Sequence, residues 1–105
     1  MRLNEIGKRG HEWAVKKGFW EKFNGSFAYK IGRIRDHAIY ALLAYKEGEK
    51  DQATVPSDKI NNSRFAEKIA DGIIEAASFL HAMGYDAEQV VKDKMDFNDK
   101  RADKQ

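Results

Sequence analysis

The sequence predicts an all-α protein, a bundle of about four helices in one domain spanning residues 1–105. Apolar residues recur at spacings of three and four along four segments, which is the helical pattern. No segment of useful length alternates apolar and polar residues at a spacing of two, as a half-buried strand would. The length of 105 residues leaves little room for a second domain.

The first helix is predicted within residues 1–18. Its apolar stripe consists of Leu3, Ile6, Trp13 and Ala14. Gly18 stands where a left-handed residue commonly closes a helix. Gly7 and Gly10 each weaken the helix by about 0.5–1 kcal/mol relative to Ala. Two glycines one turn apart therefore indicate either close backbone packing or a frayed start.

The next segments are an aromatic loop at 19–29, a second helix at 30–47 and a polar loop at 48–62. An Asn-Gly pair among several aromatic residues is typical of an ordered turn. Gly48 follows the second helix as a stop signal, and the polar loop holds the only proline. The apolar stripe of the second helix consists of Ile31, Ile34, Ala38, Ala41 or Leu42, and Tyr45.

A third helix is predicted at 63–83 and a fourth at 86–98, followed by a charged, frayed tail at 99–105. Either Asn62 or Ser63 can cap the third helix, and Gly84 ends it; this segment is the most apolar of the four and is predicted to be central. The fourth helix opens with Asp86 and Gln89, a variant of the capping box.

Composition excludes several classes of protein. The chain has no cysteine, which excludes a disulfide framework and a Cys-based zinc site. Lys plus Arg (19) barely exceed Asp plus Glu (17), so we expect no duplex nucleic acid as a partner. No apolar stretch approaches the ~20 residues of a membrane span, so we expect a cytoplasmic protein without membrane contact. A chain this short buries only about two-thirds of its unfolded surface, which makes self-association an option.

Four short motifs carry a family resemblance in their order and spacing. They are Ala14–Trp20 (AVKKGFW), Phe65–Asp71 (FAEKIAD), Gly84–Asp86 (GYD), and Lys94–Asn98 (KMDFN) with Lys100 and Arg101. Together they resemble the MazG-like, all-α nucleoside triphosphate pyrophosphohydrolases over nearly the whole chain. The resemblance implies Mg²⁺-dependent cleavage of a nucleoside triphosphate by an ExxE and an ExxD pair on facing helices, in a homodimer or homotetramer.

The acidic residues that this chemistry needs are mostly replaced. His37 and Tyr40 stand where the resemblance places the first two Glu, and Leu43 replaces a third common acid. In the second pair Lys68 replaces Glu, and only Asp71 keeps its identity. Since Mg²⁺ needs several anionic oxygens, the usual metal cluster is expected to be absent. We expect a catalytically impaired protein, without a cofactor, that binds a nucleotide or related phosphorylated small molecule.

Two other functions stay open. The chain is an active hydrolase if Asp71, as catalytic residue, and Glu75 hold Mg²⁺ or Mn²⁺ in a remodelled site. Alternatively, it is a protein interaction module whose pocket is filled by Tyr40 and Leu43. The candidate ligand-binding residues are Lys17, Trp20, His37, Tyr40, Lys68, Lys94 and Asn98.

Each of these residues also has an ordinary structural interpretation. Lys68 and Asp71, three apart, fit an intrahelical ion pair as well as a lysine in the place of a metal. Trp20 fits a small core or a subunit interface as well as a stacked base. The basic residues of the second helix fit a solvated face; they are Lys30, Arg33, Arg35 and Lys46.

Overall fold

The computed structural model describes residues 1–22, 27–47 and 55–101. Within these residues the regular structure is helical, apart from an isolated bridge between Pro56 and Ser63. The all-α fold is therefore confirmed. No helix among the described residues is long and apolar enough to cross a membrane. The helices are α1 (Leu3–Lys16), α2 (Phe19–Lys22), α3 (Phe27–Glu47), α4 (Arg64–Ala82) and α5 (Ala87–Lys100).

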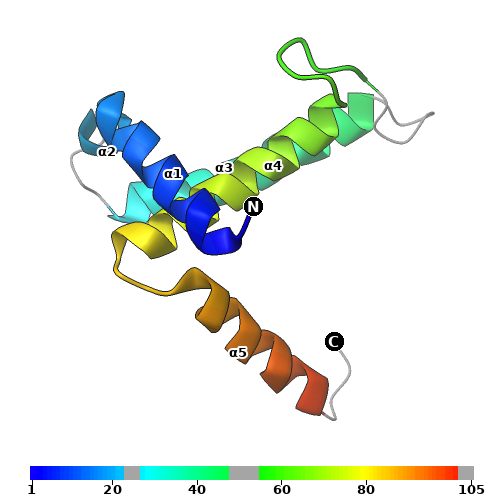
Figure 1. Cartoon of the computed structure of the whole chain (residues 1–105). Coiled ribbons are helices and arrows are strands. Elements are labelled where there is room, and N and C mark those ends of the chain that lie inside the picture. Colours follow the sequence, from blue (N-terminus) through cyan, green and yellow to red (C-terminus); the bar gives the residue numbers. More distant parts are fainter. Residues whose placement is uncertain (23–26, 48–54, 102–105) are drawn as a thin grey trace.

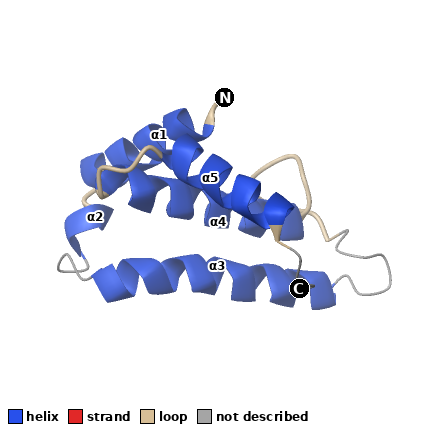
Figure 2. Cartoon of the chain, turned by 90° about the horizontal axis from the view of Figure 1, so that it is seen from below, coloured by secondary structure: helices blue, strands red, loops and turns tan. Residues whose placement is uncertain are grey.

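Helix α4 is the centre of the fold. It packs against α1 and α3 along much of its length, while α2 contacts α1 and the start of α5 contacts α1 and α4. Figure 2 shows α3 as a layer on one side of α4, with α1 and α5 on the other side. The central position predicted for the most apolar helix is confirmed.

Helices α1 and α4 approach each other closely because α1 presents two glycines to α4. A Cβ atom built on Gly7 would lie 2.5 Å from the carbonyl oxygen of Ala77. A Cβ atom on Gly10 would overlap the hydroxyl of Ser78. Of the two interpretations of these glycines, close backbone packing is the correct one.

The predicted helix ends are present in the structure. Gly18 and Gly84 have φ angles of 74° and 84°, the left-handed conformation that glycine adopts without steric cost. The hydroxyl of Ser63 accepts a hydrogen bond from the backbone N–H of Ala66, and the carboxylate of Asp86 accepts one from Gln89. Of the two cap candidates for α4, Ser63 is the cap.

Several element boundaries differ from the prediction. The segment 19–29 is not a loop throughout, because α2 forms at Phe19 and α3 already begins at Phe27. Aromatic residues are acceptable in a helix, so the turn signal overstated the irregular part. Helix α5 extends through Lys100, two residues beyond the predicted end. Gly48 and the first part of the polar loop lie outside the described residues.

Helix α5 is held at its first turn and then leads away from the other helices (Figure 1). The side chain of Asn4 donates to the carboxylate of Asp86 at 2.8 Å and accepts from the backbone N–H of Glu88 at 3.1 Å. The hydrogen bond from Asn4, followed by that from the Gln89 backbone, lowers the pKa of the Asp86 carboxyl. This connection fixes where α5 starts.

The buried apolar positions among the described residues are occupied by small side chains. Ala41, Ala44, Ala77 and Ala87 are each at most 2% exposed, and no large side chain is fully buried. Alanine at these positions lets helices approach closely but contributes little apolar area. Much of the large apolar surface therefore stays exposed in the single chain.

Candidate functional site

A cavity of about 820 Å³ opens between α1, α3 and α4. Its volume lies within the roughly 300–1,000 Å³ range of small-molecule sites. A second cavity of about 330 Å³ adjoins it, and the two share lining residues. The shared residues are Gly10 and Trp13 of α1, Arg33 of α3, and Ile74 and Glu75 of α4.

The carboxylate of Glu75 connects α4 to two basic residues of α3. Its Oε1 accepts a hydrogen bond from Nε of Arg33 at 3.2 Å, and its Oε2 lies 3.7 Å from Nε2 of His37. His37 is 7% exposed and packs close to Gly72 of α4, where a Cβ atom would lie at an ordinary contact distance of 3.6 Å from the Cβ of His37. Each carboxylate oxygen of Glu75 therefore already faces a basic side chain, Arg33 on one side and His37 on the other.

Asp71 and Glu75, the two candidate metal-binding residues, line the same cavity as His37. This pair does not fit a Mg²⁺ site, which needs several anionic oxygens free to coordinate the ion, because Glu75 is engaged by Arg33 and faces His37. Among the described residues, no three His, Asp or Glu side chains gather as metal ligands would.

Trp20 forms part of an aromatic wall at one end of the smaller cavity. The ammonium of Lys30 lies 3.6 Å from the centroid of its ring, and the ring of Phe79 lies at 6.3 Å. Lys30 is only 6% exposed. The prediction of a solvated basic face is therefore wrong for this residue, because Lys30 and Arg33 lie on the face of α3 that is turned toward α4 and the smaller cavity.

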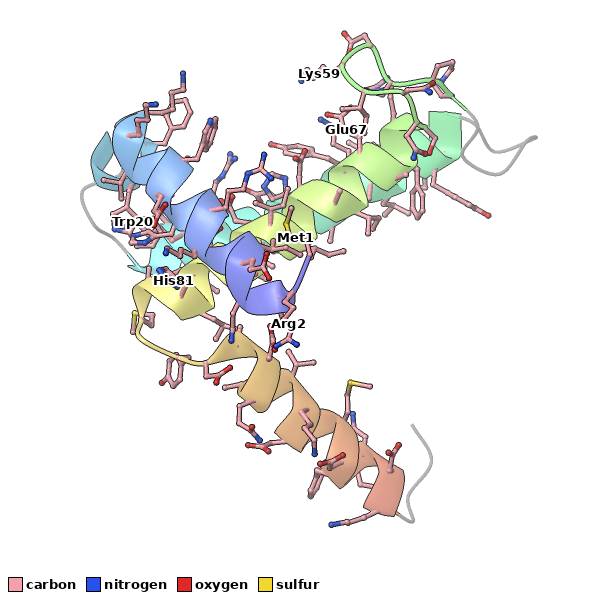
Figure 3. The ribbon with its side chains drawn as sticks, viewed as in Figure 1. Met1, Arg2, Trp20, Lys59, Glu67 and His81 are labelled. Carbon is pink, nitrogen blue, oxygen red and sulfur yellow. The ribbon has the colours of Figure 1, made fainter. Side chains whose placement is uncertain are left out.

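His11 packs against the same aromatic wall. Its ring lies edge-on to Trp20 with a centroid separation of 4.7 Å, and the ring of His81 lies at 5.5 Å. Figure 3 shows Trp20 and His81 at one end of the molecule. Burial lowers the pKa of His11 below 6.5, and the nearby His81 and Lys30 lower it further, while Glu12 opposes them.

This lowered pKa predicts a loss of stability in mild acid. The unfolded chain binds a proton at His11 near pH 6.5, whereas the folded chain resists it, so stability is fully present above pH 6.5 and falls as the pH drops through the folded pKa. Thermal unfolding measured from pH 6.5 downward is expected to show a Tm that depends less on pH in His11→Gln than in the unaltered protein. Equal slopes of Tm against pH for the two proteins would contradict the lowered pKa of His11.

Lys68 neither lines the cavity nor pairs with Asp71. It therefore forms neither the predicted intrahelical ion pair with Asp71 nor the predicted lysine in the place of a metal ion. Its ammonium lies 3.4 Å from Oε2 of its neighbour Glu67. Glu67 is 8% exposed and also accepts a hydrogen bond from the hydroxyl of Ser57. The Ser57 hydrogen bond, aided by Lys68, lowers the pKa of Glu67. Glu67 draws Lys68 toward the 55–63 loop, at the other end of the molecule from Trp20 (Figure 3).

The remaining candidates lie outside the cavity. Tyr40 is 44% exposed, with its ring 6.3 Å from that of His37, and Lys17 is an exposed residue at the end of α1. Lys94 and Asn98 are exposed on α5, which the single chain does not bring to the cavity. Their role in ligand binding stays a prediction. Leu43 is 53% exposed, so Tyr40 and Leu43 do not fill the pocket as an interaction module would require.

Three residues outside the predicted ligand-binding set also line the large cavity. They are Arg9, Trp13 and Arg33. For Arg33 the signal was available, because Lys30, Arg33 and His37 recur on one helix face at spacings of three and four. Arg9 and Trp13 come to the cavity through the angle at which α1 crosses α4, which no local pattern contains.

A scan against family models, a search of the curated proteins and a search of the solved structures find no match to this chain. These comparisons do not identify a family. The MazG-like resemblance therefore stays a hypothesis that rests on the order and spacing of the four motifs.

Proposed function

We propose that this protein binds a nucleotide or a related phosphorylated small molecule between α1, α3 and α4, and that it is a catalytically impaired relative of the MazG-like pyrophosphohydrolases. One observation supports the proposal above the others. A cavity large enough for such a ligand has an indole ring and two guanidinium groups in its lining, those of Trp13, Arg9 and Arg33.

The lining residues provide the two kinds of contact that a nucleotide needs. Trp13 lines the cavity and is 53% exposed overall, and it packs against Phe19 with a centroid separation of 5.2 Å, so its indole offers a supported platform for a base. Arg9 makes no ion pair with any other described residue, and Arg33 is half-buried. Guanidinium groups bind phosphate oxygens through paired hydrogen bonds.

The same residues favour binding over hydrolysis. Hydrolysis in the family that the chain resembles uses a metal ion as Lewis acid, held by several carboxylates. In this cavity the carboxylate that accompanies Asp71 is that of Glu75, which already accepts a hydrogen bond from Arg33. The Asp71 carboxylate remains as an acceptor for a sugar hydroxyl.

Calorimetric titration with nucleoside mono-, di- and triphosphates in EDTA tests the proposal. We expect saturable binding, accompanied by a change in tryptophan fluorescence because Trp13 lines the cavity. No heat and no thermal shift with any nucleotide at millimolar concentration would end the proposal. Pyrophosphate release in Mg²⁺ or Mn²⁺ that Asp71→Ala abolishes would show instead a working hydrolase.

A further inference from the structure

The smaller cavity has a lining of its own, besides the residues that it shares with the larger one. The described residues that line only the smaller cavity are Ala14, Phe19, Trp20, Lys30, Ser78 and Phe79. Its volume of about 330 Å³ is near the lower end of the roughly 300–1,000 Å³ range of small-molecule sites. The cavity therefore suits a compound of one or two rings.

Two pairs of aromatic rings give the smaller cavity walls that suit a flat apolar group. Trp13 packs against Phe19 with a centroid separation of 5.2 Å, and the ring of Trp20 lies 6.3 Å from that of Phe79. All four residues line the cavity, and Trp13 and Phe19 are exposed in the absence of a ligand. Aromatic rings pack favourably against other rings and gain free energy when water is removed from them. The walls therefore favour a ligand with an aromatic body.

Two basic side chains of α3 reach the same cavity. Lys30 and Arg33 are three residues apart, so they are neighbours on the surface of the helix. Lys30 is only 6% exposed, and its ammonium lies over the ring of Trp20. Burial of an ammonium costs free energy that an apolar side chain in contact with Trp20 would avoid. A lysine at this position therefore indicates that its charge has a role at the cavity.

The charges of the described lining residues indicate which head group suits this cavity. Lys30 and Arg33 are positively charged, whereas Glu75 is the negatively charged residue and already accepts a hydrogen bond from Arg33. A carboxylate brings one negative charge at neutral pH, whereas a phosphate monoester brings close to two. An ammonium and a guanidinium each carry several N–H donors, so contacts within the protein and contacts to a ligand carboxylate can coexist. The lining therefore favours a single carboxylate.

We propose that the smaller cavity binds a small aromatic carboxylic acid, with its ring against the aromatic walls and its carboxylate at Lys30 and Arg33. Attraction to a buried ammonium favours the acid over a neutral compound of the same shape, because charges interact more strongly away from water. Lys30 does not line the larger cavity, so this inference does not depend on the proposed function.

Titration of the full-length protein with matched acids and amides tests the need for a carboxylate. Benzoate and naphthoate are the probes, and benzamide and naphthamide are neutral compounds of nearly the same shape. We expect saturable binding of at least one acid by calorimetry, with a change in tryptophan fluorescence because Trp13 and Trp20 line the cavity. The corresponding amide is expected to bind about tenfold more weakly. Equal affinities of acid and amide, or no binding of either acid at millimolar concentration, would overturn the proposal.

Substitution of Lys30 by methionine tests where the carboxylate lies. Methionine keeps an apolar side chain beside Trp20 and removes the charge, so Lys30→Met is expected to bind the acid about tenfold more weakly and the amide unchanged. The control Lys46→Met removes the same charge from an exposed position of α3 that lines neither cavity, and its affinities should equal the native ones. Equal losses in both variants, or no loss in Lys30→Met, would contradict the proposal. If Lys30→Met does not fold, the comparison of acid and amide on the unaltered protein still decides the question.

Discussion

Substitution of Gly7 by alanine is expected to destabilise the protein strongly, although alanine is the better helix former. The substitution gains about 0.5–1 kcal/mol of helix propensity. It also places a methyl group 2.5 Å from the backbone carbonyl oxygen of Ala77 and 3.3 Å from the Cβ of His81. A backbone atom can move only if α1 and α4 separate, and overpacking of this kind costs about 1–3 kcal/mol before lost contacts are counted. We expect a net loss of about 2 kcal/mol, observed as a fall in Tm of roughly 10 °C.

The matched control is Gly32→Ala on α3. A methyl group there would meet only the guanidinium of Arg35, at 3.7 Å, which is ordinary contact with a flexible side chain. The helix-propensity gain is then unopposed, and stability should rise by about 0.5–1 kcal/mol. Thermal and urea unfolding of the two variants therefore should change in opposite directions. Two changes of the same sign would mean that the backbones of α1 and α4 are not in close contact at Gly7.

Substitution of Arg33 by alanine is expected to weaken nucleotide binding by about tenfold to a hundredfold, which corresponds to one charge-assisted contact of about 1.5–3 kcal/mol. Arg33 lines both cavities and is oriented by its 3.2 Å hydrogen bond to Glu75. Arg33→Lys keeps the charge but loses the paired geometry, so it should bind with intermediate affinity. Calorimetry with the best nucleotide of the panel measures all three affinities.

Arg35→Ala removes the same charge from the same helix and is the control. Its side chain is 74% exposed and lines neither cavity, and its guanidinium lies 3.4 Å from the carboxylate of Asp36. Affinity is expected to stay within about twofold of the native value, since an exposed ion pair contributes little. Equal losses from Arg33→Ala and Arg35→Ala would show that the ligand responds only to overall charge and would remove the cavity from the proposal.

Local signals in the sequence predicted the fold well because each acts over a few residues. Gly18, Gly84, Ser63 and Asp86 mark helix ends through backbone conformation and single hydrogen bonds, and all four have the predicted role. The apolar character of residues 63–83 also predicted the central position of α4. The start of α3 at Phe27 was not predicted, because the Asn-Gly turn signal in the 19–29 segment was given more weight than the aromatic residues, which are compatible with a helix.

The site was harder to predict because it depends on how helices face each other. Asp71 and Glu75 were candidate metal-binding residues and do line one cavity, but the partners of Glu75 come from α3. Lys68 pairs with Glu67 because the 55–63 loop folds back and Ser57 fixes that carboxylate. No spacing within one helix contains either contact. The geometry that decides the site is tertiary.

The packing of α1 and α3 around α4 determines how the protein unfolds. Because α1 and α3 each rest on α4, separation of α4 from either one removes support from the whole assembly, so opening there approaches global unfolding. Among residues 1–22, 27–47 and 55–101, the hydrogen bonds that join α5 to the other helices lie at its first turn, so its later turns can open while the remainder stays intact. Amide hydrogen exchange should therefore divide the chain into a cooperative unit and an independently fraying arm.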